Sequence, residues 1–168
     1  MADSTNQHSE TIIILYDLGG HILCSSAILP PYTIEELAGK PAWYLLAPHD
    51  ALICQAAFHR CGESKTPQTY DQDIPAIGRW RITIHACRAG KVRFIGHARK
   101  FPESVLCLTD RQREICALLA RGMTSREIAK HLELARETID NHRSGIARRI
   151  GIKPWSLLAW CGEHREWL

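Results

Sequence analysis

The stretch TSREIAKHLELARETIDNHRSGIARRIG, residues 124–151, contains two short amphipathic helical patterns that lie almost back to back. Thr124 and Glu127 have the spacing of a capping box, in which the threonine oxygen accepts an amide proton of the first turn and the glutamate reaches back. This spacing predicts that a helix begins at Thr124. The predicted inner side of that helix carries Ile128, Ala129 and Leu132.

The second pattern predicts a helix that begins near Arg136 and has two contrasting faces. At about 100° per residue, successive positions distribute around the helix so that apolar residues gather on one side. The inner face contains Ile139, His142, Ile146 and Ile150. The opposite face contains Glu137, Asp140, Asn141, Ser144 and Arg148. We expect this polar face to meet solvent or a partner.

Another helix is predicted just before the pair, over LTDRQREICALLARG, residues 108–122, with Asp110 in its first turn and Gly122 as its C-terminal stop. Three short helices with a tight turn between the last two form a helix-turn-helix, whose second helix can enter the major groove of DNA. Periodicity alone leaves an alternative open, which is a small helical bundle with a solvated polar face.

The segment LTDRQREICALLARGMTSREIAKHLELARETIDNHRSGIARRIGI, residues 108–152, resembles the DNA-binding domain of LuxR-type (GerE-type) transcriptional regulators. The matching positions are Leu108-Thr109, Arg113-Glu114, Leu118, Gly122, Glu127-Ile128-Ala129, Leu132, Thr138-Ile139, His142, Ile146 and Gly151. The resemblance implies an all-α domain of four helices over residues 104–168. Its fourth helix, PWSLLAWCGEHREWL at residues 154–168, would help to form a homodimer.

The same resemblance implies that residues 136–149 form the recognition helix and contact double-stranded DNA. Asn141 and Ser144 are the candidates for contacts to base edges, because Asn can pair with adenine through two hydrogen bonds. The candidates for phosphate contacts are Arg136, Thr138, Arg143, Arg148 and Arg149. Asp140 departs from the family, which usually has a cation here. Its carboxylate repels phosphate, although it can accept a hydrogen bond from cytosine.

The first hundred residues predict an α+β domain with one half-buried antiparallel sheet. TIIILYDLGGHILCSSAIL at 11–29 has the pattern strand, Gly-Gly turn, strand. TIEELAGK and PHDALICQAAFHRCGE have helical patterns, and GRWRITIHA and KVRFIGHAR have the alternation of two antiparallel strands joined at CRAG. This order resembles a PAS sensor domain over residues 11–100. The joint to the second domain is expected at ARKFPES, residues 98–104, because Pro102 does not continue a strand.

A PAS domain commonly holds a small molecule or cofactor between its sheet and helices, or pairs with a partner and relays a signal. The expected pocket residues are Trp43, Tyr44, Cys54, Phe58, Trp80 and Ile82. The sequence does not name a cofactor. His59 on the longer helix is the candidate haem ligand, but Cys54, Ala57, Phe58 and Cys61 are better placed for the inner face, so we expect His59 to face water.

Composition limits the remaining functions. The 168 residues carry 21 Lys+Arg and 18 Asp+Glu, and the whole excess of +3 lies in residues 104–168, which suits a polyanionic partner. The polar start and a short apolar run predict a cytoplasmic protein without a membrane span. Seven cysteines without a Cys-x-x-Cys pair are expected to be buried thiols, and no metal site is expected.

No catalytic motif is found, so the chain is expected to be a DNA-binding transcriptional regulator rather than an enzyme. In this interpretation a PAS-like input domain, acting on a small molecule or partner protein, controls a helix-turn-helix output domain. Two alternatives stay open: a PAS-mediated interaction module with weakened DNA recognition, and a direct haem- or flavin-type sensor.

Overall fold

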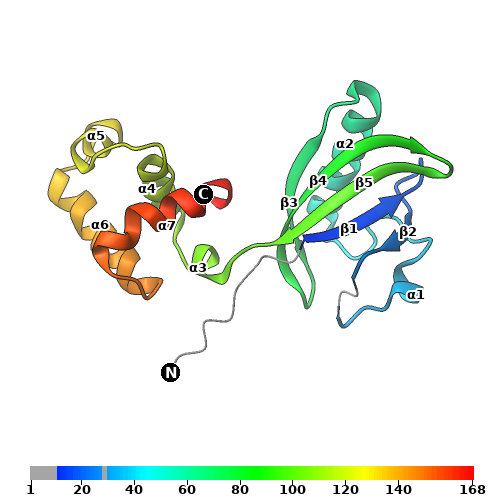
Figure 1. Ribbon diagram of the computed structural model, residues 1–168, viewed down its shortest axis with the longest axis horizontal. Helices are drawn as coiled ribbons and strands as arrows, with labels where there is room; N and C mark the ends of the chain where they lie inside the picture. The colour runs from blue at the N-terminus through cyan, green and yellow to red at the C-terminus, as the bar shows by residue number, and fades with distance from the viewer. Residues whose placement is uncertain (1–10, 28–29) are drawn as a thin grey trace. The chain divides into compact units, whose positions relative to one another are not determined.

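The computed structural model describes residues 11–27 and 30–168, which divide into two compact units (Figure 1). One unit ends at Lys100 and the other begins at Phe101. The last two residues of the strand pattern expected at 11–29, and the polar start of the chain, lie outside the described residues. Among the helices of the described ranges, none is both long and apolar enough to cross a lipid bilayer.

The N-terminal unit is built on a five-stranded antiparallel sheet in the order β2-β1-β5-β4-β3. Its strands are β1 (Thr11–Tyr16), β2 (Ile22–Ser25), β3 (Gln68–Ile74), β4 (Gly78–Ala89) and β5 (Val92–Lys100). Its helices are α1 (Ile34–Leu37) and α2 (Pro48–Ser64). The α+β fold with one antiparallel sheet, expected from the sequence, is therefore confirmed.

One face of this sheet packs against α2. In β4 the apolar alternation holds as predicted, with Trp80, Ile82 and Ile84 buried beneath the helix. From α2 the buried residues are Cys54, Ala57, Phe58 and Cys61. Phe58 lies at the centre of this layer, because its ring meets those of Tyr16 and Phe94 edge-on, with centroids 4.9 and 5.1 Å away. This packing closes the core on one side of the sheet.

Strand β3 was not predicted from the sequence. Only Tyr70 and Gln72 of this strand are fully buried, and its other positions are polar except Ile74, so it lacks an apolar alternation. It forms because its backbone pairs with β4 along its whole length, from Gln68 opposite Ile84 to Ile74 opposite Gly78. The hairpin after β4 also turns later than expected, beyond Ala89.

The C-terminal unit is all-helical, with four α-helices of seven residues or more and a short one before them. Its elements are α3 (Glu103–Leu106), α4 (Asp110–Ala120), α5 (Ser125–His131), α6 (Arg136–Arg149) and α7 (Leu157–Glu163), with 3₁₀ turns η1 (Pro154–Ser156) and η2 (Arg165–Trp167) beside α7. The fourth expected helix is thus shorter than residues 154–168. Ile115, Ile128, Ile139 and Ile146 are fully buried and form the centre of the core.

Capping explains where the helices of this unit begin. Thr124 and Glu127 form the predicted capping box at α5, and Thr109 and Gln112 form another at α4. Each box satisfies amide groups that have no partner within the helix. The hydrogen bonds from the backbone N–H and the hydroxyl of Thr124 lower the pKa of Glu127.

Of the seven cysteines that were expected to be buried, four are buried, two are exposed and Cys87 is half-buried. The buried thiols are Cys54, Cys61, Cys116 and Cys161. Cys24 is exposed because β2 is an edge strand, and Cys107 is exposed at the end of α3. Burial raises the pKa of Cys54 to about 11, so this thiol stays protonated near neutral pH.

Candidate DNA-binding surface and ligand cavities

Helices α5 and α6 are joined by a tight turn over residues 132–135. Leu132 closes α5, and the amide of Leu134 donates to the carbonyl of Ala129 at 2.9 Å, which folds the chain back. Between them Glu133 adopts a left-handed backbone with φ of 54°, which is uncommon for a residue other than glycine. The turn fixes α6 at an angle to α5, as in a helix-turn-helix.

Helix α6 buries one side and presents a polar stripe on the other. The buried side contains Ile139, Ile146 and Ala147. The stripe consists of Glu137, Asn141, Ser144 and Arg148, all exposed. Because these four positions follow the spacing i, i+4, i+7 and i+11, they form one continuous line along the helix. We call this line the α6 stripe.

One flank of the stripe carries Arg136, Asp140 and Arg143, which are held by other side chains. The Asp140 carboxylate lies 3.5 Å from the Arg136 guanidinium, so the anion that departs from the family pattern has a cation of its own. The Arg143 guanidinium donates to the Ser125 hydroxyl at 2.6 Å and is half-buried. Arg143 thereby ties α6 to the first turn of α5.

The other flank carries Thr138 and Arg149. Thr138 is half-buried. The guanidinium of Arg149 donates to the carbonyl of Cys107 at 3.1 Å and to Gln112 Oε1 at 3.3 Å, so it links the end of α6 to the start of α4. The eight residues predicted for DNA contact therefore all lie on α6. Four of them are engaged in contacts within the unit, namely Arg136, Asp140, Arg143 and Arg149.

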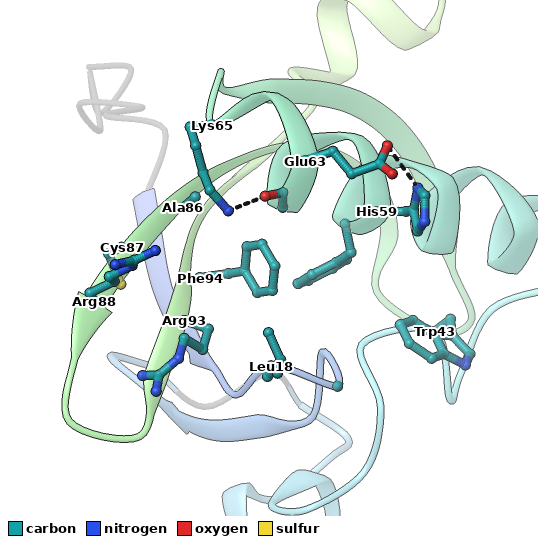
Figure 2. Close-up of a pocket in the computed structure, with 13 residues that line it drawn as sticks. Leu18, Trp43, His59, Glu63, Lys65, Ala86, Cys87, Arg88, Arg93 and Phe94 are labelled. Carbon is teal, nitrogen blue, oxygen red and sulfur yellow. Dashed lines mark hydrogen bonds and ion pairs between the residues drawn. The ribbon is translucent and has the colours of Figure 1, made fainter.

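Five of the six residues predicted for a ligand pocket divide between two cavities of the N-terminal unit, and the sixth lines neither. Tyr44, Trp80 and Ile82 line a cavity of about 50 Å³ that we call the inner cavity. Trp43 and Phe58 line a larger pocket of about 740 Å³ that we call the outer pocket (Figure 2). Cys54 lines neither, because it is fully buried and in contact with the Tyr70 hydroxyl at 3.3 Å.

The inner cavity contains a polar group that sequence reasoning missed. Gln72 of β3 is 6% exposed and lines this cavity beside Trp80 and Ile82. Its Oε1 atom accepts no hydrogen bond from any described residue. Burying an amide oxygen without a donor is unfavourable, so this oxygen is suited to a bound molecule that donates a proton. A polar residue at an inward position of a strand is the signal that could have found it.

The outer pocket lies between the second half of α2, the β4–β5 hairpin and the turn after β1 (Figure 2). His59 lines it but is 74% exposed, as expected, and its Nδ1 lies 3.2 Å from a Glu63 carboxylate oxygen. Phe94, Arg88 and Arg93 of the hairpin also line it, and the sequence analysis did not select them. These side chains come from segments far apart in the chain.

Residues 106–158 match the family model of bacterial regulatory proteins of the luxR family. A response regulatory protein of Escherichia coli K12, YgeK, is 42% identical over 45 residues, which are 27% of this chain and 31% of that protein. The spore germination protein GerE of Bacillus subtilis is 39% identical over 46 residues, covering 27% of this chain and 62% of GerE. The chain thus spans less than two thirds of either of these relatives.

A solved structure resembles nearly the whole chain. The Vibrio cholerae VqmA protein in a complex described as VqmA–ligand–DNA covers 89% of this chain and 81% of its own, with a TM-score of 0.56 and 14% sequence identity. At this identity the likeness concerns the fold. It shows that another protein combines two units with these folds, and that they follow one another in the same order along the chain.

Proposed function

We propose that this chain, whose residues 106–158 form a LuxR-type helix-turn-helix domain, is a transcriptional regulator that binds double-stranded DNA through α6 under the control of its PAS-like N-terminal unit. The observation that carries the proposal is the exposed α6 stripe on a helix presented by a helix-turn-helix. Because a regulator of this class acts on chromosomal DNA, the proposal includes a location in the bacterial cytoplasm.

The contacts around α6 assign different roles to its polar residues. Asn141 and Ser144, in the middle of the stripe, are free to reach base edges in the major groove. Arg148 is exposed at its end and is suited to a phosphate contact. Arg143 and Arg149 act by positioning α6, since their guanidinium groups bind Ser125 and the start of α4. The ion pair with Arg136 reduces the repulsion between Asp140 and phosphate.

The region around α7 supports pairing of two copies. Trp155 of η1 is 79% exposed and Leu158 of α7 is 53% exposed, so two large apolar side chains lie close together on the surface. Apolar surface of this kind is commonly covered by a partner. A symmetric dimer formed there would present two α6 helices to half-sites about 34 Å apart, one turn of DNA.

The inner cavity supports control by a small molecule. A ligand that donates a hydrogen bond to Gln72 Oε1 would satisfy the one buried side-chain oxygen that lacks a partner among the described residues. The volume of the inner cavity, about 50 Å³, suits a small compound or a few water molecules. Such a ligand changes DNA binding only if it binds the active and inactive arrangements with unequal affinity.

The test is a selection of DNA duplexes from a random pool by the full-length protein, followed by anisotropy titrations at several salt concentrations. We expect one enriched motif, and complexes with it that survive salt at which random duplexes dissociate. Replacing Asn141 by Ala should reduce the preference for one base pair by about 1–3 kcal/mol.

Ser144→Ala provides the matched control on the same stripe, and its effect should fall on a different base pair from that of Asn141→Ala. An unenriched pool, with binding that depends on salt alone, would contradict the proposal. That result would favour the alternative in which the N-terminal unit docks a partner protein and DNA recognition has weakened.

A further inference from the structure

The outer pocket has the size of a ligand site and is open to solvent, and the proposed function leaves it unused. Its volume of about 740 Å³ lies within the range of small-molecule sites. The pocket is separate from the inner cavity, because none of the residues that line it also lines the inner cavity. Its walls come from α2, the β4–β5 hairpin and the turn at Leu18 and Gly19.

The floor of the outer pocket is aromatic, and its rings pack against one another. Phe58 and Phe94 meet edge-on with ring centroids 5.1 Å apart, and Trp43 meets Phe58 at 6.2 Å. Leu18 adds an apolar side chain that is 76% exposed at the edge of the pocket. An exposed leucine next to an aromatic floor offers contact area to an apolar chain.

The rim of the pocket is charged unevenly. Figure 2 shows Arg88 and Arg93 on one side and the His59–Glu63 pair on the other, with Lys65 beside the hairpin. Among the described residues that line the pocket, only Glu63 carries a carboxylate, and it lies 3.2 Å from His59. Arg93 uses Nη1 to bind the carbonyls of Gly90 and Val92, which leaves its other N–H groups for an anion. The hairpin side is therefore suited to a carboxylate.

Gly62 keeps the pocket open above this floor. It lies in α2, where glycine costs about 1 kcal/mol relative to alanine. A Cβ atom placed on Gly62 would lie 3.5 Å from the Phe94 ring, an ordinary contact, so nothing in the packing forbids a side chain. A larger side chain at this position would occupy the space over Phe94. The glycine thus leaves room that a ligand can use.

We propose that the outer pocket binds an amphipathic carboxylate, such as a medium-chain fatty acid, with its head group at Arg88 and Arg93 and its apolar chain over Phe58, Phe94 and Leu18. Arginine binds carboxylates through two parallel hydrogen bonds. The aromatic floor supplies apolar contact area, which increases with the length of the ligand's hydrocarbon chain. The proposal goes beyond DNA binding and does not depend on it.

Calorimetric titration of the full-length protein with hexanoate, octanoate and decanoate tests the proposal. Affinity should rise about fourfold per added methylene, because each contributes about 0.8 kcal/mol on burial. The uncharged probe 1-octanol should bind at least tenfold more weakly than octanoate. Equal binding of octanol and octanoate would overturn the role of the two arginines.

Matched variants locate the site. The double variant Arg88→Gln, Arg93→Gln should weaken octanoate binding at least tenfold, whereas Lys91→Gln on the same hairpin, outside the pocket, should leave it unchanged. Gly62→Leu should weaken octanoate binding at least tenfold, because the leucine would occupy the space over Phe94. Two results would overturn the proposal. One is that Lys91→Gln weakens octanoate binding as much as the double variant does, and the other is that Gln72→Leu abolishes octanoate binding. A failed DNA selection would leave these results unaffected.

Discussion

The two units of the chain orient the polar groups that we propose for binding in opposite ways, outward in the C-terminal unit and inward in the N-terminal unit. In the C-terminal unit the polar residues of α6 point outward along an exposed stripe, above the buried Ile139 and Ile146. In the N-terminal unit Gln72 points inward, into a cavity lined by Trp80 and Ile82. The surface that we propose for DNA could be predicted from helical periodicity, whereas the cavity that we propose for a small molecule depends on what the tertiary fold encloses.

The largest expected effect tests whether the two cores are separate. Ile146 is fully buried in the core of the C-terminal unit, so Ile146→Ala should destabilise that unit by about 2–5 kcal/mol and abolish DNA binding. Hydrogen-exchange mass spectrometry should show lost protection in α4 to α7 and unchanged protection in the strands β1 to β5. Equal loss in the sheet would mean that the two units fold as one.

A neighbouring pair of arginines tests the division between recognition and positioning. Arg148→Ala should weaken binding to all DNA sequences without changing the melting temperature of the protein. The slope of log K against log salt concentration should fall by about one, which corresponds to the loss of one phosphate contact. Arg149→Ala should lower the free energy of unfolding of the C-terminal unit by about 1 kcal/mol, because its hydrogen bonds to Cys107 and Gln112 are lost. Identical effects of both changes on stability and on binding would remove the distinction.

A substitution at Gln72 tests whether the inner cavity is kept polar for a ligand. Gln72→Met has a similar shape and removes the unpartnered oxygen, so the free energy of unfolding of the ligand-free protein should rise by about 1 kcal/mol. Thermal unfolding measures this gain. A destabilised variant would show instead that ordered water or an internal donor already satisfies the oxygen.

The smallest expected effect concerns the turn between α5 and α6. Glu133 has a φ of 54°, a conformation that glycine adopts without steric cost, so Glu133→Gly should stabilise the C-terminal unit by about 0.5 kcal/mol. Chemical denaturation followed by helical circular dichroism measures the change. Leu132→Gly, at the neighbouring position with φ of −97°, is the control and should destabilise.

The C-terminal unit could be read from the sequence because its determinants are local. The recognition helix expected at residues 136–149 is α6 as observed, and the capping box at Thr124 marks the start of α5. Periodicity and capping depend on residues within a few positions of one another. The roles of Arg143 and Arg149 could not be read in this way, since their partners Ser125 and Cys107 lie 18 and 42 positions away.

The N-terminal unit was predictable only in outline. The alternation of Trp80, Ile82 and Ile84 predicted β4, because one face of that strand is buried between these residues. Strand β3 has no comparable pattern, since backbone pairing with β4 rather than apolar burial defines it. The two cavities were predicted as one pocket, because the sequence indicates which residues face inward and not which of them line the same cavity in the folded unit.

The polar composition of β3 has a consequence for how the sheet meets other chains. β3 is an edge strand, and edge strands can add a strand from another molecule and aggregate. Asp71 and Asp73 hold charged pairs with Arg81 and Arg79 along this edge, and the opposite edge, β2, has only four residues. The charged residues of β3 and the shortness of β2 protect the two edges of the sheet from pairing with another chain. The polar residues that kept β3 from being predicted therefore also discourage the formation of fibres.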